Sequence, residues 1–425
     1  MHKAIVAEIK ETVQIPGADK IQVAKVLGES VIVSKDWNVG MVGVLFPIDL
    51  QLSEEFCHYN NLYRDSEKNA DKTKKGFFEK NRRVRAQPFM KVKSEGFFTD
   101  LSCLEYLGDV GELKVGTAFD TINGKMVCQK YISEEAKIAK GNNATKQAKK
   151  NYAPLFEKHV DSEQFRHYAE NIQPGSILYF HYKVHGTSHR QAYTLVDAEL
   201  PKWKKHINRL VKIFPEQKWD YVVGTRNVVL RNADKEGHHG SEQFRFDVAE
   251  MLKPYLEKGM TIYGEIAGYA NGRPIMPDHN IKMLKDKRYT KKYGDTVRYS
   301  YGCKEHEFRF HVYRITYLNH EGKNIDMTQA QMEKWCNDRG ILTTIEVHPP
   351  IIYDGDVDKL RELVHSLTER EEVLTESYID PSHLSEGIII REESGSMTPK
   401  FYKSKSYAFR VCEGHVEVAD EETIN

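Results

Sequence analysis

A stretch of about twenty residues without apolar periodicity divides this chain into two parts. Between 131 and 152 the sequence contains SEEAKIAKGNNATKQAKKNY, in which lysine, asparagine and alanine dominate. This composition predicts a linker or an exposed helix rather than part of a core. Because 425 residues exceed the usual size of one domain, we expect two folded units, 1–130 and 153–425, joined by a basic linker over 131–152.

The two units differ in their strand pattern. In the first, the β-branched or aromatic runs IVAEI, QVAKVL, SVIVS and MVGVLFPI are short and are separated by glycines and a proline. Such close spacing predicts a small β-barrel. In the second, longer strand-like segments alternate with helical ones such as DVDKLRELVHSLTER, which Asp356 is placed to cap. We therefore expect a substantial sheet together with helices after Tyr152.

The composition narrows the class of protein. Hydrophobic residues make up 40% and aromatic residues 11% of the chain, as in globular proteins. Six scattered cysteines indicate a reducing compartment and argue against a zinc site. No apolar run is long enough to cross a membrane, so we expect a cytoplasmic or otherwise intracellular protein without membrane contact. Acidic and basic residues balance at 62 each, but basic clusters occur at 72–85, 137–151 and 282–298.

Lys183 ends the aromatic, apolar run YFHY and is followed by His-Gly-Thr-Ser. A lysine that acts as a nucleophile must lose its proton, and partial desolvation beside other cations favours this loss. The pattern K-x-x-G alone is weak, because it also occurs at Lys25, Lys93 and Lys291. Lys183 could therefore equally end a strand, with Gly186 making the turn.

Five further segments follow in a fixed order, and together they are far more specific: GTRN (224–227), YGEIAG (263–268), FRFHVYRI (308–315), SEGIIIRE (385–392) and KFYKSKS (400–406). This arrangement resembles the covalent nucleotidyltransferase superfamily of ATP-dependent ligases and capping enzymes. Within it, His-Gly-Thr-Ser after the lysine resembles the RNA ligases. The resemblance implies an α+β fold in which an ATP-grasp-like adenylyltransferase domain is built from antiparallel sheets and helices.

The resemblance also implies roles for individual residues. Lys183 would form a covalent lysyl-AMP with ATP, and Gly186, after His185, would let the backbone approach the nucleotide. Glu265 would contact the ribose, and Glu386, with Glu265, would serve a divalent metal, Mg²⁺ or Mn²⁺. Both carboxylates lie in apolar runs, where an unpaired charge is costly. The alternative to these functional roles is that each carboxylate forms a structural ion pair.

The remaining roles concern the base and the phosphates. Phe310 would stack on adenine, although an aromatic at strand spacing is more often core, and Phe308 and Tyr313 are neighbouring candidates. Arg226 would contact the nucleotide or the nucleic acid. Arg190 would read the 3'-terminal ribose or phosphate, or form a surface salt bridge. Arg166 would contact the β- and γ-phosphates. Among the lysines of KFYKSKS, Lys403 and Lys405 would contact the α-phosphate. The other possible register of this motif uses Lys400 and Lys403.

The N-terminal unit has a resemblance of its own. IPGADKIQVAKVLGESVIVSKDWNVGMVGVLFPIDLQL is similar to the OB-type module that precedes the ligase domain in one RNA ligase family. The segment KVKSEGFFTDL at 91–101 departs from that family's pattern. With this module, the resemblance covers nearly the whole chain. It implies an OB-type, nucleic-acid-binding barrel over 1–130, and a nucleotidyltransferase unit that adenylylates itself when cut off at about 150.

The leading hypothesis is an ATP-dependent RNA ligase that joins a 3'-hydroxyl to a 5'-phosphate. Its expected partner is RNA, as a nicked duplex with RNA on the 3'-hydroxyl strand, and we expect a monomer, encoded by a cell or by a phage or virus. An mRNA capping guanylyltransferase, a DNA ligase and a non-catalytic OB-fold RNA-binding protein are the alternatives. In capping enzymes the OB module normally follows the catalytic motifs, so the order of the modules counts against that alternative.

Overall fold

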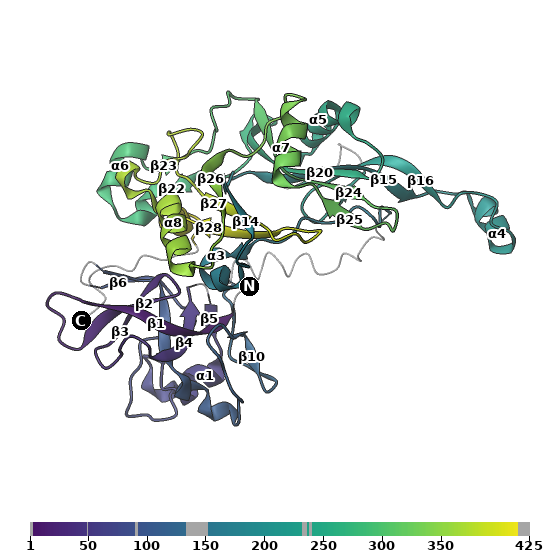
Figure 1. The fold of residues 1–425 in the computed structure, drawn as a ribbon. Coiled ribbons are helices and arrows are strands. Elements are labelled where there is room, and N and C mark those ends of the chain that lie inside the picture. The colour runs from purple at the N-terminus through teal and green to yellow at the C-terminus, as the bar shows by residue number, and fades with distance from the viewer. Residues whose placement is uncertain are drawn as a thin grey trace.

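The computed structural model describes residues 3–48, 50–89, 92–132, 152–231, 236–237 and 240–414. Most of the predicted linker, with the basic segment 137–151, lies outside these residues. Figure 1 shows the N-terminal strands gathered on one side and the later elements on the other. The expected combination of a barrel-like N-terminal sheet and a mixed α+β unit is confirmed. No helix among the described residues is long and apolar enough to span a membrane.

The N-terminal unit is built around one long strand. β1 (Ala4–Gln14) pairs antiparallel with β2 at one end and with β4 and β9 at the other, and a bulge between Ile9 and Glu11 bends it. The backbone of Glu95 donates to Ser30 O at 2.7 Å, so the two ends of the sheet nearly meet. The other elements are β2 (Ile21–Val26), β3 (Glu29–Ser34), β4 (Val42–Pro47), β5 (Leu50–Leu52), α1 (Glu54–Tyr59), β6 (Gln87–Phe89), β7 (Val92–Ser94), β8 (Gly96–Asp100), β9 (Ala118–Phe119), β10 (Thr121–Ile122), β11 (Lys125–Met126) and β12 (Cys128–Lys130).

Two sheets form the frame of the second unit. In the smaller, the strand order is β13 (Glu163–Gln164), β28 (Lys400–Lys405), β27 (Gly387–Glu393), β14 (Ile177–Tyr182) and β26 (Glu346–Ile352). The larger runs β17 (Val229–Leu230), β16 (Gln217–Gly224), β15 (Thr187–Asp197), β20 (Met260–Ala270), β24 (Phe308–Leu318) and β25 (Asn324–Asp326), and β21 (Arg273–Pro274) pairs with β20. Apart from β13 with β28, the pairs are antiparallel, as expected.

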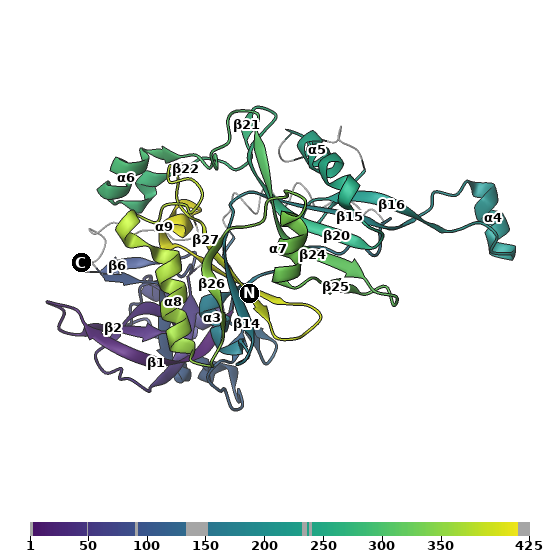
Figure 2. The same ribbon diagram turned by 45° about the horizontal axis from the view of Figure 1, so that its top comes forward.

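Among the described residues, helices pack on one face of each sheet. Leu360 and Val364 of α8 (Val357–Glu369) pack on the smaller sheet, and the Asp356 side chain caps this helix as predicted. α5 (Gln243–Leu252) and α7 (Gln329–Asn337) pack on the larger sheet (Figure 2). The opposite faces are left to line the space between the sheets. The remaining elements are α3 (Phe165–Tyr168), α4 (Lys202–Leu210), β18 (Glu236–Gly237), β19 (Gly240–Ser241), β22 (His279–Asn280), α6 (Lys287–Tyr293), β23 (Thr296–Val297) and α9 (Tyr407–Cys412).

The two units share a hydrophobic core. Ile48 and Ala86 of the N-terminal unit pack in one cluster with Tyr182 and Val184, which flank Lys183. A cut at about 150 would therefore remove part of the support of the strand that carries Lys183. The structure thus predicts a destabilised fragment rather than the self-sufficient one expected from the motifs.

A buried ion pair adds to this interface. Glu29, 2% exposed, lies 2.8 Å from Arg166. Burial favours the neutral form of Glu29, but the charges of Arg166, His167 and Arg410 outweigh it and lower the pKa of Glu29. The N-terminal unit therefore supplies a negative charge on which the cations of the second unit depend.

We predict that Glu29→Gln lowers the free energy of unfolding by about 3–5 kcal/mol at pH 7, because it removes the carboxylate of the buried ion pair with Arg166. The pKa of Glu29 is lowered in the folded state. The difference in the free energy of unfolding between variant and wild type should therefore be complete above pH 4.5, the ordinary pKa, and shrink as the pH falls below it. Urea unfolding across this pH range measures it. The exposed Glu11→Gln is the matched control; equal effects of the two substitutions would contradict the prediction.

Candidate active site

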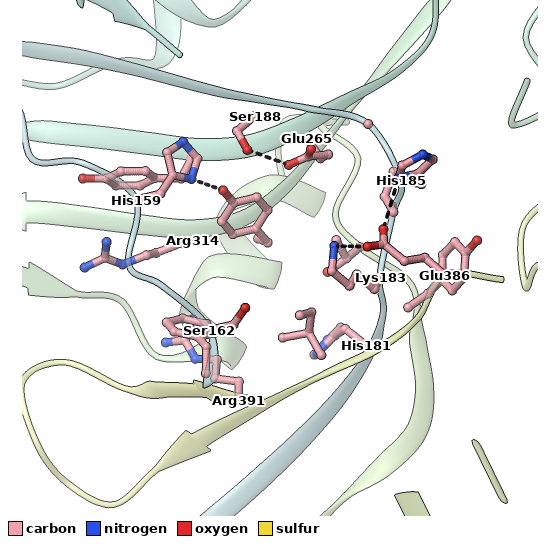
Figure 3. Close-up of a pocket in the computed structure, with 18 of the residues that line it drawn as sticks. His159, Ser162, His181, Lys183, His185, Ser188, Glu265, Arg314, Glu386 and Arg391 are labelled. Atoms are coloured by element: carbon pink, nitrogen blue, oxygen red, sulfur yellow. Dashed lines mark hydrogen bonds and ion pairs between the residues drawn. The ribbon is translucent and has the colours of Figure 1, made fainter. Parts of the chain in front are cut away.

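A pocket of about 360 Å³ lies between the open faces of the two sheets. β14, β27 and β28 line one side, and β15, β20 and β24 line the other. Figure 3 shows Lys183, His185 and Glu386 together at one end, with His159 and Arg314 towards the other. Of the predicted residues, this pocket brings together Lys183, His185, Gly186, Arg226, Glu265, Glu386 and Lys405.

Lys183 lies directly after the last residue of β14. Its backbone N–H donates to Gly387 O at 2.9 Å, which fixes the strand end beside β27. Its Nζ lies 2.8 Å from Glu386 Oε1, and Lys405 Nζ lies 2.9 Å from the same oxygen. Two ammonium groups from different strands thus share one carboxylate oxygen.

The charges of this cluster depend on one another. Burial opposes ionisation of Glu386, which is 2% exposed, but Lys183, Lys405 and His185 outweigh it and hold the pKa of Glu386 well below its usual range. For Lys405, burial is likewise outweighed, by Glu386 and Glu413, and its pKa is raised. Glu386 is therefore an anion that binds cations rather than a proton donor.

Glu265 reaches the pocket from the opposite sheet. It lies on β20 opposite Ser188 of β15, whose hydroxyl donates to Glu265 Oε2 at 3.2 Å. Burial raises the pKa of Glu265 to about 7, and the charge of Glu386 acts in the same direction. The two predicted carboxylates therefore differ sharply, because Glu386 touches cations and Glu265 touches a hydroxyl.

Gly186 is required by a neighbouring strand. A Cβ on Gly186 would lie 2.3 Å from Ile266 O and 2.9 Å from Glu265 Cγ, both on β20. No side chain fits at that distance. The sequence predicted that this glycine admits the nucleotide, but the close approach seen in the structure is between the Lys183 turn and β20.

The segment 274–306 supports the turn from behind. The backbone N–H of His185 donates to Tyr301 Oη at 2.6 Å, and the His185 ring packs on Tyr299 with its centroid 4.8 Å away. Phe409 of α9 packs on the other side, also at 4.8 Å. This segment, which lies between two of the motifs, thus packs against His185 and helps to hold it beside Glu386.

Phe310 does not reach the pocket. It is 4% exposed and belongs to the core under the helices, with its ring where a Cβ of Gly264 would lie. A bulge in β24 explains this, because Tyr263 pairs with Arg314 and Gly264 with Val312, which leaves Tyr313 without a partner. Tyr313 and Arg314 consequently both line the pocket. The expectation that Phe310 faces the nucleotide is therefore wrong for this pocket, whereas Tyr313, one of the two neighbouring candidates, lines it.

Arg190 also has a different environment from either predicted one. It is 1% exposed, donates to the carbonyls of Thr225, Phe156 and Glu157, and lies against the Phe156 ring. It is neither a surface salt bridge nor part of the pocket lining. Instead, it anchors the segment that carries His159 over the pocket.

The other two predicted arginines lie at the edges. Arg226 lines the pocket and pairs with Asp161. Arg166 lies in a second cavity, of about 420 Å³, between the two units, which it shares with Lys403 and Lys405. Lys405 lines both cavities, so the two lie side by side along β28.

Strand alternation supports one register of the last lysine motif. Phe401, Lys403 and Lys405 share a face of β28, opposite Tyr402, which is in the core. Lys400 lies on the face of Tyr402, with its Nζ 3.9 Å from Glu392. Burial, with the charges of Lys183 and Lys405, lowers the pKa of Lys403 to about 8. Lys403 and Lys405, the favoured pair, therefore face the same side as Lys183.

The pocket lining also contains polar residues that sequence reasoning did not assign, among them His159, Arg391 and Glu413. His159 bonds the Tyr313 hydroxyl, Arg391 donates to Glu393 at 2.9 Å, and Glu413 lies 2.7 Å from Lys405. Arg391 belongs to the motif SEGIIIRE. It lies two residues after Ile389 on the same strand, so strand alternation could have predicted that both face the pocket. His159 and Glu413 lie outside the motifs, and nothing in the sequence singles them out.

A divalent cation fits one group of side chains at this site. Within the described residues, ligand atoms of His185, Glu386 and Glu413 lie within 4.8 Å of one another, and the buried Glu386 Oε2 has no hydrogen-bond partner. The two carboxylates suit Mg²⁺ and Mn²⁺, whereas imidazole is a more usual ligand of metals such as Zn²⁺. The predicted metal pair was Glu265 and Glu386. Glu386 belongs to this group with His185 and Glu413, whereas Glu265 lies across the pocket and does not.

Comparison with known proteins adds a fold and a family. Curated protein sequences give no match. The chain is similar to the structure of the Naegleria gruberi RNA ligase with PPi, at 17% identity and a TM-score of 0.56 over 96% of this chain and 98% of that chain. A variant of that ligase with ATP and Mn gives 15% and 0.56, over 96% and 97%. Identity this low establishes a shared fold. The model of the family described as RNA ligase matches residues 176–406, more than half of the chain, and this chain therefore belongs to the RNA ligase family.

Proposed function

We propose that this protein is an ATP-dependent RNA ligase that seals nicks through an AMP covalently bound to Lys183. The observation that carries the proposal is the cluster in which Glu386 Oε1 lies 2.8 Å from Lys183 Nζ and 2.9 Å from Lys405 Nζ at the end of a nucleotide-sized pocket. One lysine is enough for a structural ion pair with Glu386. The second ammonium group at the same oxygen provides an extra positive charge, which suits the binding of a phosphate.

In the first step, Lys183 Nζ attacks the α-phosphate of ATP. A P–N bond forms, the bond from the α-phosphorus to the bridging oxygen breaks, and pyrophosphate leaves. Attack requires the neutral amine, so the ion pair with Glu386 must loosen when ATP enters. The cations Lys403 and Lys405 lie on the face next to Lys183, where they can neutralise charge on the α-phosphate.

The remaining side chains have supporting roles. Arg226, which lines the pocket, and Arg166, which lines the second cavity, would contact the outer phosphates or the nucleic acid. Glu265 would contact the ribose hydroxyls, since a carboxyl or carboxylate beside Ser188 can accept hydrogen bonds from them. A bound Mg²⁺ or Mn²⁺ would neutralise phosphate charge, and His185, Glu386 and Glu413 would hold it.

Two further transfers complete the proposed reaction. AMP passes from Lys183 to the 5'-phosphate of RNA, and the 3'-hydroxyl then displaces it. The N-terminal unit, which we assign as an OB-type module, would hold the duplex beside the pocket, because OB folds bind nucleic acid with basic grooves and aromatic platforms. Arg82 and the other cations of 72–85 lie in this unit.

The first prediction concerns the nucleophile. Lys183→Ala should lower transfer of labelled AMP from ATP to the protein by at least about 10³-fold, because no other amine replaces the attacking one. Glu386→Ala should also suppress transfer and alter the dependence on Mg²⁺, since it removes the charge at the proposed metal. Lys291→Ala, at another K-x-x-G, is the control. Retained labelling in a folded Lys183→Ala protein would exclude Lys183, and labelling by GTP instead of ATP would favour a capping guanylyltransferase.

The second prediction separates Tyr313 from Phe310. Tyr313→Leu removes a stacking partner worth about 1–3 kcal/mol, so half-maximal adenylylation should need roughly 5- to 150-fold more ATP. Phe310→Leu should leave the ATP requirement unchanged and instead lower the free energy of unfolding by about 1 kcal/mol, because it alters only the core. Titrating ATP and measuring thermal unfolding of both variants decides. A raised ATP requirement for Phe310→Leu alone would restore the sequence-based assignment.

The third prediction concerns the nucleic acid. A nick with ribonucleotides on the 3'-hydroxyl side should be sealed at least about 10-fold faster than an all-DNA nick, because only RNA presents a 2'-hydroxyl there. Ribose on the 5'-phosphate side should matter less, since AMP joins the phosphate whatever the sugar. Sealing rates on the four nicked duplexes test this. Equal rates on RNA and DNA would favour a DNA ligase.

A further inference from the structure

The connection between β15 and β16 projects from the body of the protein and ends in helix α4 (Figures 1 and 2). The two strands remain paired out to Asp197 and Gln217, and the backbone N–H of Ala198 then donates to Glu216 O at 2.8 Å. We call residues 199–215 beyond this last bond the arm. The proposed steps at Lys183 use none of its residues.

The arm has an internal structure of its own. Asn208, 7% exposed, accepts hydrogen bonds from the backbone N–H groups of Ile213 and Phe214 and donates to Phe214 O at 2.7 Å. The rings of Trp203 and Phe214 meet edge to face at 5.6 Å, and Lys204 Nζ lies 4.9 Å from the Phe214 ring. These contacts hold the returning chain against the helix, so the side chains on its other faces have a defined arrangement.

One face of α4 is cationic. Lys202, Lys205 and Arg209 are three and four residues apart, so they lie on the same side of the helix, and all three are exposed. The helix contains no acidic residue. Glu199, the one acidic residue of the arm, pairs with Arg231 on the body. No ion pair within the described part of the chain neutralises the three cations.

An adjacent face of α4 is apolar and also exposed. Trp203 and Leu210 are 57% and 79% exposed, and Val211 and Ile213 extend the patch. Exposed apolar groups beside cations also occur in helices that bind membranes or acidic proteins. The net positive charge of the arm favours a polyanion as its partner. Because the arm continues β15, which also lines the pocket, its position favours nucleic acid over other polyanions.

We propose that the cationic face of α4 binds the sugar–phosphate backbone of the nucleic acid held at the pocket. The proposal rests on the proposed function. β15 carries Ser188 at the pocket and Asp197 at the base of the arm, about 30 Å apart at about 3.3 Å per residue. At about 3.4 Å per nucleotide, a duplex leaving the pocket along this sheet reaches the arm about nine base pairs from the nick.

The test compares three proteins with wild type. In the first, Lys202→Gln, Lys205→Gln and Arg209→Gln remove the cationic face. In the second, a two-residue Asn-Gly turn replaces the arm, which the intact pairing of Asp197 with Gln217 permits. The control carries Lys323→Gln, Lys334→Gln and Lys359→Gln, an equal loss of charge at exposed positions on the body.

Sealing is measured on nicked duplexes with about 20 and about 6 base pairs on each side of the nick, which do and do not reach the arm. For both arm variants we expect the KM for the long duplex to rise at least about 10-fold, with the short duplex and self-adenylylation unchanged. The slope of log KM against log salt should fall by about 2–3, as for three lost phosphate contacts. The control protein should match wild type.

An unchanged KM for the long duplex, or an equal rise for both duplexes, would overturn the proposal. Binding of wild type, but not of the arm variants, to phosphatidylserine vesicles together with an unchanged KM would identify a membrane contact instead. If wild type transfers no AMP, the proposed function fails separately; anisotropy of a labelled long duplex then decides whether the arm binds nucleic acid.

Discussion

The arrangement of the pocket depends on one buried carboxylate. Glu386 is 2% exposed, and a charge buried to this degree is stable only beside opposite charges. Those charges come from Lys183 after β14 and Lys405 at the end of β28. β14, β27 and β28 must therefore be neighbours, and the smaller sheet has this order. Lys405 also pairs with Glu413, so positive and negative side chains alternate from Lys183 through Glu386 and Lys405 to Glu413.

The surroundings of this cluster include residues of the N-terminal unit and of the segment 274–306. Val184 and Tyr182, on either side of Lys183, pack in a core to which the N-terminal unit contributes Ile48 and Ala86. The segment 274–306 adds Tyr299 and Tyr301 to the same core. The position of a single lysine thus depends on residues far apart in the sequence, although the motifs that identify it are short.

The sequence predicted well what depends on local order and composition. The barrel-like unit, the helix begun by Asp356 and the grouping of Lys183, Glu265 and Glu386 required only motif order and strand patterns. Phe310 could not be placed correctly, because the bulge at Tyr313 shifts which residues face the pocket and leaves no sign in the sequence. Arg190 was misassigned because the carbonyls that it binds belong to a segment more than thirty residues away. Glu413 lies after the last motif, where only the three-dimensional fold shows its contact with Lys405.

The central claim is that Lys183, and no other lysine of this cluster, carries the nucleotide. The most direct measurement is mass spectrometry of peptides from the full-length protein after incubation with ATP and Mg²⁺. The account predicts one AMP on the peptide that contains Lys183, linked through nitrogen and therefore labile in acid and stable in base. AMP on the peptide that contains Lys403 or Lys405, or no adduct on a protein that seals RNA, would contradict it.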